Sequence, residues 1–165
     1  MQAQPDFAPE YNVKAALLTK FARYTEWPAN TFSGNSDPII IGVVGEDPFG
    51  QVLPETARQQ TGPRPLLVRH LTNPVEAADC QVVFISRAES EHEAAWLGAL
   101  KGKPIVTVGE SGQTLERGGT LEFKLVEGRV RFDASWPAMQ QAGLKFSADM
   151  LQFAHKVFKR REDLK

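Results

Sequence analysis

Side chains able to carry catalysis or hold a metal are few and scattered in this sequence. The three histidines, His70, His92 and His155, lie far apart and lack the spacing of a metal-ligand set. The single cysteine, Cys80, opens the apolar run CQVVFIS, which favours a buried, inert thiol over a nucleophile. No G-x-S-x-G nucleophile elbow is present. We therefore expect no catalytic constellation, no metal site, no cofactor and no enzymatic activity.

The run IIIGVVGEDPFG, residues 39–50, is the stretch that most resembles a ligand-binding loop. Its glycines do not have the G-x-G-x-x-G spacing, and no Gly-Lys-Ser/Thr follows. Glu46 and Asp47 would repel a phosphate placed there. A structural interpretation is favoured, in which Gly45 ends a strand, Asp47 and Pro48 start a turn, and Phe49 folds back into the core.

Four apolar runs predict strands of a mostly parallel sheet, at 39–44, 65–71, 80–86 and 104–109. Runs of this kind are typical of strands buried on both faces. Helical segments at 51–60 and 88–100 alternate with them, the second capped by Ser86, which indicates βαβ units. A first helix is predicted at 9–27, with Val13, Leu17, Phe21 and Tyr24 on its core face. Trp27 would close it, packed at the helix end or exposed as an anchor for a partner.

The pattern changes after residue 109. The segment TLEFKLVEGRVRFDAS alternates apolar and polar residues around Glu127-Gly128, which predicts an antiparallel hairpin. Two helices should follow, at 136–142 ending at Gly143, and at 148–160 capped by Ser147. The predicted fold is an α/β sheet flanked by helices, flavodoxin- or Rossmann-like, with a C-terminal antiparallel hairpin and helices.

A crevice for a small molecule is predicted beyond the carboxyl ends of the parallel strands, where ligands bind in open α/β sheets. Three loops should meet there, at 45–50, 86–89 and 109–112. They would bring one set of polar side chains together: Glu46, Asp47, Ser86, Arg87, Glu89, Glu110 and Ser111. Glu89, Glu91 and Glu93 are explained by the dipole of the helix that they begin.

Length, charge and hydropathy limit the class of protein. The 165 residues fit one domain, expected at 9–165 after a flexible segment at 1–8. A net charge of −1 gives no field that would attract nucleic acid. No apolar run reaches the roughly 18 residues that a membrane span needs. The start MQAQPDFAPE shows no signal peptide, although it is compatible with a mature chain from which a signal has been cleaved.

The ordered segments resemble the YfiR family over residues 11–155. The similarity is carried by VKAALLTKFARYTEWP, IIIGVVGEDPFG, RPLLVRHL, CQVVFIS, PIVTVGE, GGTLEFKLVEGRVRFD and AGLKFSADMLQFA. Each motif alone is weak, whereas the set in this order is specific.

The resemblance implies an exported periplasmic regulator that forms homodimers. It implies that the protein represses an inner-membrane GGDEF diguanylate cyclase, YfiN in the family's described system, by contacting the periplasmic region of that enzyme. Release of repression raises cyclic di-GMP and favours biofilm formation. Disulfide-based redox control described in the family does not transfer as an intrachain switch, because Cys80 is the single cysteine.

Three functions remain open at this point. The first is a binding module whose apolar anchors dock on a membrane partner, with Trp136, Met139, Phe146, Phe153 and Phe158 as candidates. The second is a sensor that binds a small ligand at the predicted crevice. The third is a hydrolase with Asp47 or Glu110 as a base. Basic clusters at 129–131 and 159–161 are interpreted as solvated charge, with contact to an anion or a membrane surface as the alternative.

Overall fold

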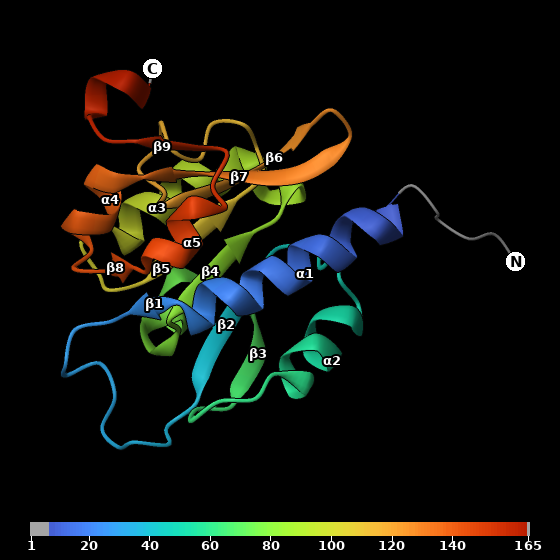
Figure 1. Cartoon of the computed structure of the whole chain (residues 1–165), viewed down its shortest axis with the longest axis vertical. Coiled ribbons are helices and arrows are strands. Elements are labelled where there is room, and N and C mark those ends of the chain that lie inside the picture. The colour runs from blue at the N-terminus through green and yellow to red at the C-terminus, as the bar shows by residue number, and fades with distance from the viewer. Residues whose placement is uncertain (1–6, 165) are drawn as a thin grey trace, which may run out of the picture.

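A computed structural model describes residues 7–164 (Figure 1). Within that range, seven strands form one sheet in the order β3-β2-β4-β5-β6-β7-β9. The strands β3, β2, β4, β5 and β6 are mutually parallel, in the 2-1-3-4-5 order of flavodoxin-like folds. The strand bounds are β2 Ile39–Val44, β3 Leu66–Leu71, β4 Val82–Ile85, β5 Val106–Gly109, β6 Leu121–Val126, β7 Arg129–Ser135 and β9 Lys156–Phe158. The predicted fold class and its four parallel strands are confirmed.

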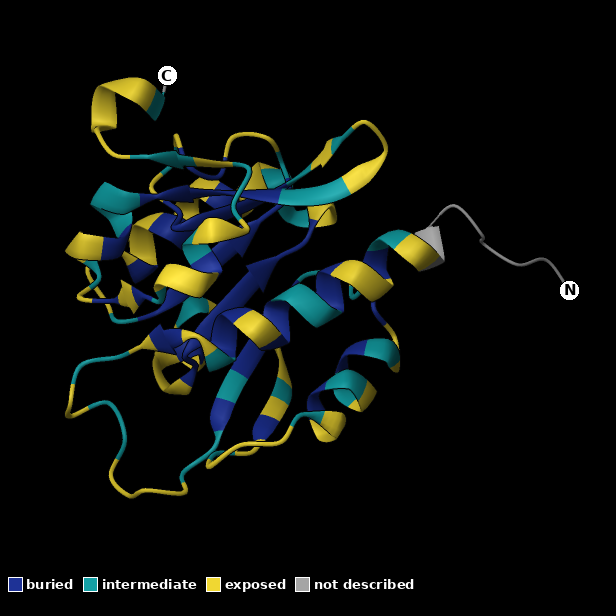
Figure 2. Cartoon of the chain, in the orientation of Figure 1, coloured by how far each residue is buried: buried dark blue, intermediate teal, exposed yellow. Residues whose placement is uncertain are grey.

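Helices cover both faces of this sheet, and a core lies on each side. On one face, α1 (Phe7–Arg23), α2 (Val52–Gln59), α4 (Trp136–Gln141) and α5 (Ala148–Gln152) pack on the strands. On the other face lie the 3-10 helix η1 (Pro74–Asp79) and α3 (Glu93–Leu100). In Figure 1, α1 crosses in front of the strands and α3 lies behind them. The central strands are almost wholly buried (Figure 2).

The edge strand β3 departs from the predicted burial on both faces. It pairs with β2 alone, and its Leu67 is 49% exposed. The helix expected at 88–100 is also divided, into the 3-10 helix η2 (Arg87–His92) and α3. Ser86 stands at the predicted N-cap, but its hydroxyl makes no capping hydrogen bond.

The antiparallel hairpin forms as predicted between β6 and β7. Both turn residues adopt the left-handed conformation, with φ of 52° at Glu127 and 78° at Gly128, as a type I′ turn requires. Phe123 stands opposite Phe132 in the register. Phe21 of α1 packs on both rings, so the hairpin forms part of the main core.

The predicted core face of the first helix is partly correct: Phe21 is buried and Leu17 packs against the core, but Val13 and Tyr24 do not. Val13 is 44% exposed and Tyr24 is 48% exposed, and α1 ends at Arg23 rather than near residue 27. The buried stripe instead runs through Tyr11, Ala15, Leu18 and Ala22. Of the expected N-terminal segment 1–8, residues 1–6 lie outside the described range, and α1 already includes residues 7 and 8.

The long C-terminal helix expected at 148–160 is also wrong. Ser147 caps α5 as predicted, since its hydroxyl accepts the N–H of Met150 at 3.1 Å, but α5 ends at Gln152. Residues 156–158 then form β9 and pair in parallel with β7. The backbone groups of β9 thereby form hydrogen bonds with the edge of β7, which a helix at these residues would leave unpaired.

Smaller elements complete the fold. The helix α4 ends at Gln141, and Gly143 adopts φ of 73° just after it, as predicted for a residue that follows a helix C-terminus. The strands β1 (Thr25–Glu26) and β8 (Lys145–Phe146) form a separate antiparallel pair, and the 3-10 helix η3 (Arg161–Leu164) follows β9. Within residues 7–164, no helix is long and apolar enough to cross a membrane.

Candidate functional site

The predicted crevice exists at the carboxyl ends of β2, β4 and β5. It is a hollow of about 410 Å³ lined by Tyr11, Glu46, Pro48, Ser86, Arg87, Ala88 and Glu110. The three predicted loops therefore meet, and four of the seven predicted polar residues line the hollow. Asp47, Glu89 and Ser111 do not, because each of them bonds to a side chain outside it.

The turn after β2 has the structural role that its residues indicate. Gly45 adopts φ of +83°, and a Cβ there would lie 2.0 Å from Cγ of Glu89. Asp47 Oδ1 accepts the N–H of Phe49 at 2.7 Å. The ring of Phe49 is 3% exposed and makes edge contacts with the rings of Tyr11 and Phe84. The loop is thus fastened to the core rather than open around a phosphate.

Glu110 forms a buried polar cluster with α1. Its side chain is 1% exposed, and the ammonium of Lys14, 2% exposed, lies 2.6 Å from Oε1. The hydroxyl of Tyr11 donates to the same carboxylate at 3.1 and 3.2 Å. The backbone N–H of Arg87 donates to Oε2 at 2.8 Å. This cluster fastens α1 to the carboxyl end of β5.

Charges in the cluster are balanced internally. Lys14 also pairs with Glu10, and the guanidinium of Arg87 lies 3.6 Å from the same Glu10 carboxylate. Two carboxylates therefore face two cations. Burial, followed by the negative charge of Glu110, raises the pKa of Tyr11 and keeps its phenol protonated. Because both oxygens of Glu110 already accept hydrogen bonds, this carboxylate is poorly placed to serve as a general base.

The remaining predicted polar residues belong to three other groups. Asp47 Oδ2 lies 2.6 Å from Nε2 of His70, an exposed side chain on β3. Glu89 lies beside His92, with 3.3 Å between carboxylate and ring nitrogen. Ser111 donates to Glu93 at 2.6 Å.

Glu93 is the centre of a second buried network. Its side chain is 1% exposed and accepts hydrogen bonds from Ser111, from Thr114 at 2.7 Å and from Arg117 at 2.9 Å. A Cβ at Gly109 would lie 2.4 Å from this carboxylate. The helix dipole is therefore an incomplete account of Glu93, which fastens α3 to the loop after β5.

The candidate partner-binding residues lie at different depths. Met139 and Phe146 are 3% and 4% exposed and belong to the core, whereas Trp136 and Phe158 are half-buried. Phe153 is 69% exposed at the end of α5. The structure does not bring these five side chains together as one surface.

Phe153 instead borders a groove between α1, α5 and β7, with a volume of about 500 Å³. The apolar side chains of Val13, Leu17, Tyr24 and Val130 line it. Lys20, Arg131 and Asp149 also border the groove. We call this feature the α1–α5 groove.

Tyr11 and Lys14 are functional-site candidates that the sequence analysis missed. The apolar spacing of Tyr11, Ala15, Leu18 and Ala22 was the signal available for this face. Lys14 lies between those positions, but no local pattern pairs it with a glutamate 96 residues away.

The chain belongs to the YfiR/HmsC-like family, whose model matches residues 11–155. This confirms the resemblance over the residues that carried it. Membership places the chain among regulatory rather than catalytic proteins, in the setting of cyclic di-GMP signalling. A comparison with curated proteins finds no match.

Proposed function

We propose that this protein is a periplasmic regulator that represses an inner-membrane GGDEF diguanylate cyclase through direct contact with the periplasmic region of that enzyme. Through this contact it controls cyclic di-GMP levels and biofilm formation. Family membership supports the regulatory role, and the α1–α5 groove is the observation that carries the binding role. The protein acts by binding and catalyses no reaction.

The groove has the composition of a protein-binding surface. Phe153, Tyr24 and Val13 are 69%, 48% and 44% exposed and lie along one depression. Contiguous apolar surface of this kind marks interaction sites, and aromatic side chains dominate their binding energy. Phe153 is therefore the principal anchor in this proposal. Met139 and Phe146 serve the core beneath it.

A binding assay with matched variants tests the proposal. The partner is the periplasmic region of a GGDEF membrane protein encoded beside this chain, and the readout is titration calorimetry. Phe153→Ser should weaken binding by about tenfold or more, as loss of an interface anchor does. Leu67→Ser is the control, because Leu67 is 49% exposed on β3, at the opposite edge of the sheet from β9. It should bind as the wild type does.

Two results would contradict this. If the two proteins do not associate at micromolar concentration, the proposal of repression by direct contact is wrong. If Phe153→Ser binds as tightly as the wild type, the interface lies outside the groove. The proposal includes a homodimer, which sedimentation of wild-type protein and Phe153→Ser tests. If Phe153→Ser is monomeric but still binds the cyclase, the groove is the dimer interface and not the cyclase-binding surface.

A small-molecule sensor acting on another membrane partner is the second candidate function. One observation favours it: the Ser86 hydroxyl lines the crevice, is buried and has no hydrogen-bond partner among the described residues. A ligand bound there would raise the melting temperature of the wild type. A metabolite screen in which every shift survives Ser86→Ala would exclude the crevice as the site.

A further inference from the structure

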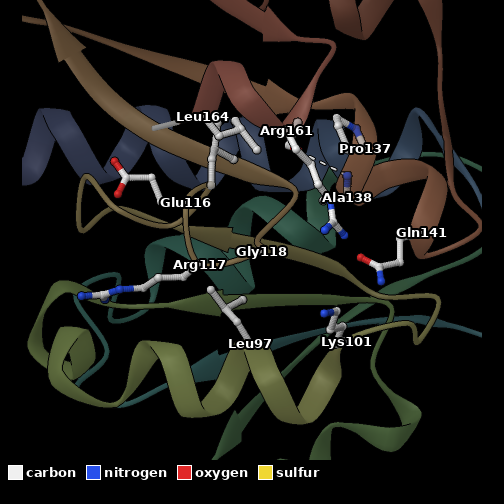
Figure 3. A pocket seen from close by; sticks show the side chains of 12 residues that line it. Leu97, Lys101, Glu116, Arg117, Gly118, Pro137, Ala138, Gln141, Arg161 and Leu164 are labelled. Carbon is white, nitrogen blue, oxygen red and sulfur yellow. Dashed lines mark hydrogen bonds between the residues drawn. The ribbon is translucent and has the colours of Figure 1, made fainter.

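A separate cavity of about 530 Å³ opens between α3, α4 and η3 (Figure 3). The turn at 115–118 forms one of its walls. Its volume falls within the range of small-molecule sites, roughly 300–1,000 Å³. It shares no lining residue with the crevice or with the α1–α5 groove.

Apolar side chains form part of the walls of this cavity. Leu97 of α3 and Leu115 each present a side chain that is otherwise buried in the fold. Pro137 of α4 and Leu164 of η3 contribute to the same lining, and both are half-buried. These four side chains would contact the hydrocarbon part of a ligand and exclude water from it.

Polar side chains converge on the cavity from three separate elements. In Figure 3, Arg161 and Lys101 extend into it from opposite sides, and the amide of Gln141 lies beside them. Glu116 and Arg117 extend away from this group in the same view. Two cationic groups and one amide therefore share a space with apolar walls.

Among residues 7–164, no ion pair compensates the charge of these two cations. Arg117 pairs with the buried Glu93, and Arg160 pairs with Asp163. Arg161 and Lys101, in contrast, form no ion pair with any residue in the range 7–164. The crevice differs in this respect, because its buried Glu110 is paired with Lys14 and its Arg87 lies beside Glu10.

We propose that this cavity binds a small amphipathic organic anion, with its carboxylate held by Arg161 and Lys101 and its hydrocarbon part against the leucine and proline walls. Arginine and lysine donate charge-assisted hydrogen bonds to carboxylates. The apolar walls favour a ligand with a hydrocarbon body over a free phosphate, which would leave them in contact with water. This inference goes beyond the proposed repressor function and does not rest on it.

A competing explanation assigns each cation a local role. Lys101 stands at the C-terminal end of α3, where the helix dipole favours a positive charge, and Arg161 belongs to a surface 3-10 helix. That explanation predicts no preference for anionic ligands. Ligands of matched length and different charge therefore separate the two.

The test is an NMR titration of the full chain with hexanoate, hexylamine and hexanol, followed by backbone amide shifts. Hexanoate should shift amides of residues 97–101 and 135–141, with a Kd on the order of 1 mM for a ligand of this size. Hexylamine and hexanol should each have an affinity at least about tenfold lower than that of hexanoate, because they lack the negative charge.

Matched double variants complete the experiment. Lys101→Gln/Arg161→Gln should weaken hexanoate binding about tenfold while the melting temperature stays unchanged, since both side chains are exposed. Lys103→Gln/Lys159→Gln removes the same charge from exposed positions that do not line the cavity, and should bind hexanoate normally.

Three outcomes would overturn the inference: equal binding of the three ligands, unchanged hexanoate binding by Lys101→Gln/Arg161→Gln, or shifts confined to the α1–α5 groove. Because the readout is direct binding to this chain, its failure leaves the cyclase experiment unaffected. Likewise, failure of the cyclase-binding experiment would not affect the proposal for this cavity, which the hexanoate titration tests.

Discussion

Lys14 of α1 has a buried ammonium group, and replacing this residue is the most direct test of how α1 is held in place. We consider Lys14→Met, which keeps a side chain of similar length but removes the ammonium that lies over the rings of Tyr11 and Phe123. The substitution removes the positive charge that lies 2.6 Å from Glu110. The glutamate would then remain buried as an uncompensated anion.

The expected loss of unfolding free energy is about 3 kcal/mol. Removing one partner of a buried ion pair costs roughly 3–5 kcal/mol. The lower value applies here because the Tyr11 hydroxyl and the Arg87 N–H still donate to Glu110. For a chain of this size, about 2–4 °C per kcal/mol corresponds to a fall in melting temperature of roughly 6–12 °C.

Urea unfolding of a double-mutant cycle measures this effect. Glu110→Gln in the Lys14→Met background neutralises the orphaned carboxylate, so the double variant should be more stable than Lys14→Met alone. Lys20→Met is the control on the same helix, because Lys20 is exposed, and it should change stability by less than about 0.5 kcal/mol. A loss below about 1 kcal/mol in Lys14→Met would refute the reasoning.

Three further predictions concern backbone strain, thiol reactivity and pH. Gly45→Ala should destabilise the fold by about 1–3 kcal/mol in urea, because φ of +83° and Glu89 both oppose a Cβ; a neutral result would mean that the loop shifts freely. Burial raises the pKa of the Cys80 thiol to about 11, so iodoacetamide at pH 8 should alkylate it slowly unless urea is present; equal rates would place the thiol at the surface. Burial also raises the pKa of Glu122, which faces Asp133 across the hairpin. The protonated carboxyl is the form that the fold favours, so the stabilisation is present below the ordinary glutamate pKa and is lost as pH rises through the folded-state pKa. Glu122→Gln, which keeps the acceptor for the Leu115 N–H, should therefore be more stable than the wild type at pH 7, and this difference should vanish in acid; a constant difference across pH would contradict the assignment.

Local patterns predicted the strands and turns because those elements satisfy their requirements within a few residues. The apolar run at 39–44, the glycine at 45 and the turn at Glu127-Gly128 each specify their own backbone conformation. The meeting of three loops at one rim followed from the general topology of parallel sheets. These features needed no knowledge of which strands become neighbours.

Predictions of helix faces failed where two stripes of one helix were similarly apolar. On α1, the stripe through Val13 and Tyr24 and the stripe through Tyr11 and Leu18 both have helical spacing. The second packs in the core, and Lys14 on that side pairs with the carboxylate of Glu110. The choice depends on a contact across 96 positions of sequence, which local periodicity does not contain.

The same limit explains the C-terminal segment and the site residues. Residues 156–158 form a strand because β7 presents an unpaired edge beside them, and the edge outweighs their helical pattern. Phe153 was available from the sequence as a candidate anchor, but its grouping with Val13 and Tyr24 follows from the packing of α5 against α1 and β7.

From the sequence alone it followed that this chain forms a parallel α/β sheet with a hairpin, that its single cysteine lies in a buried run and that it resembles the YfiR family. Short-range sterics, apolar periodicity and motif order are properties of neighbouring residues, so they can be read along the chain. Which charges are neutralised, and which remain available, depends on the tertiary structure. Charge balance depends on distances between side chains from remote elements, so Lys14 is paired internally whereas Arg161 and Lys101 face an open cavity.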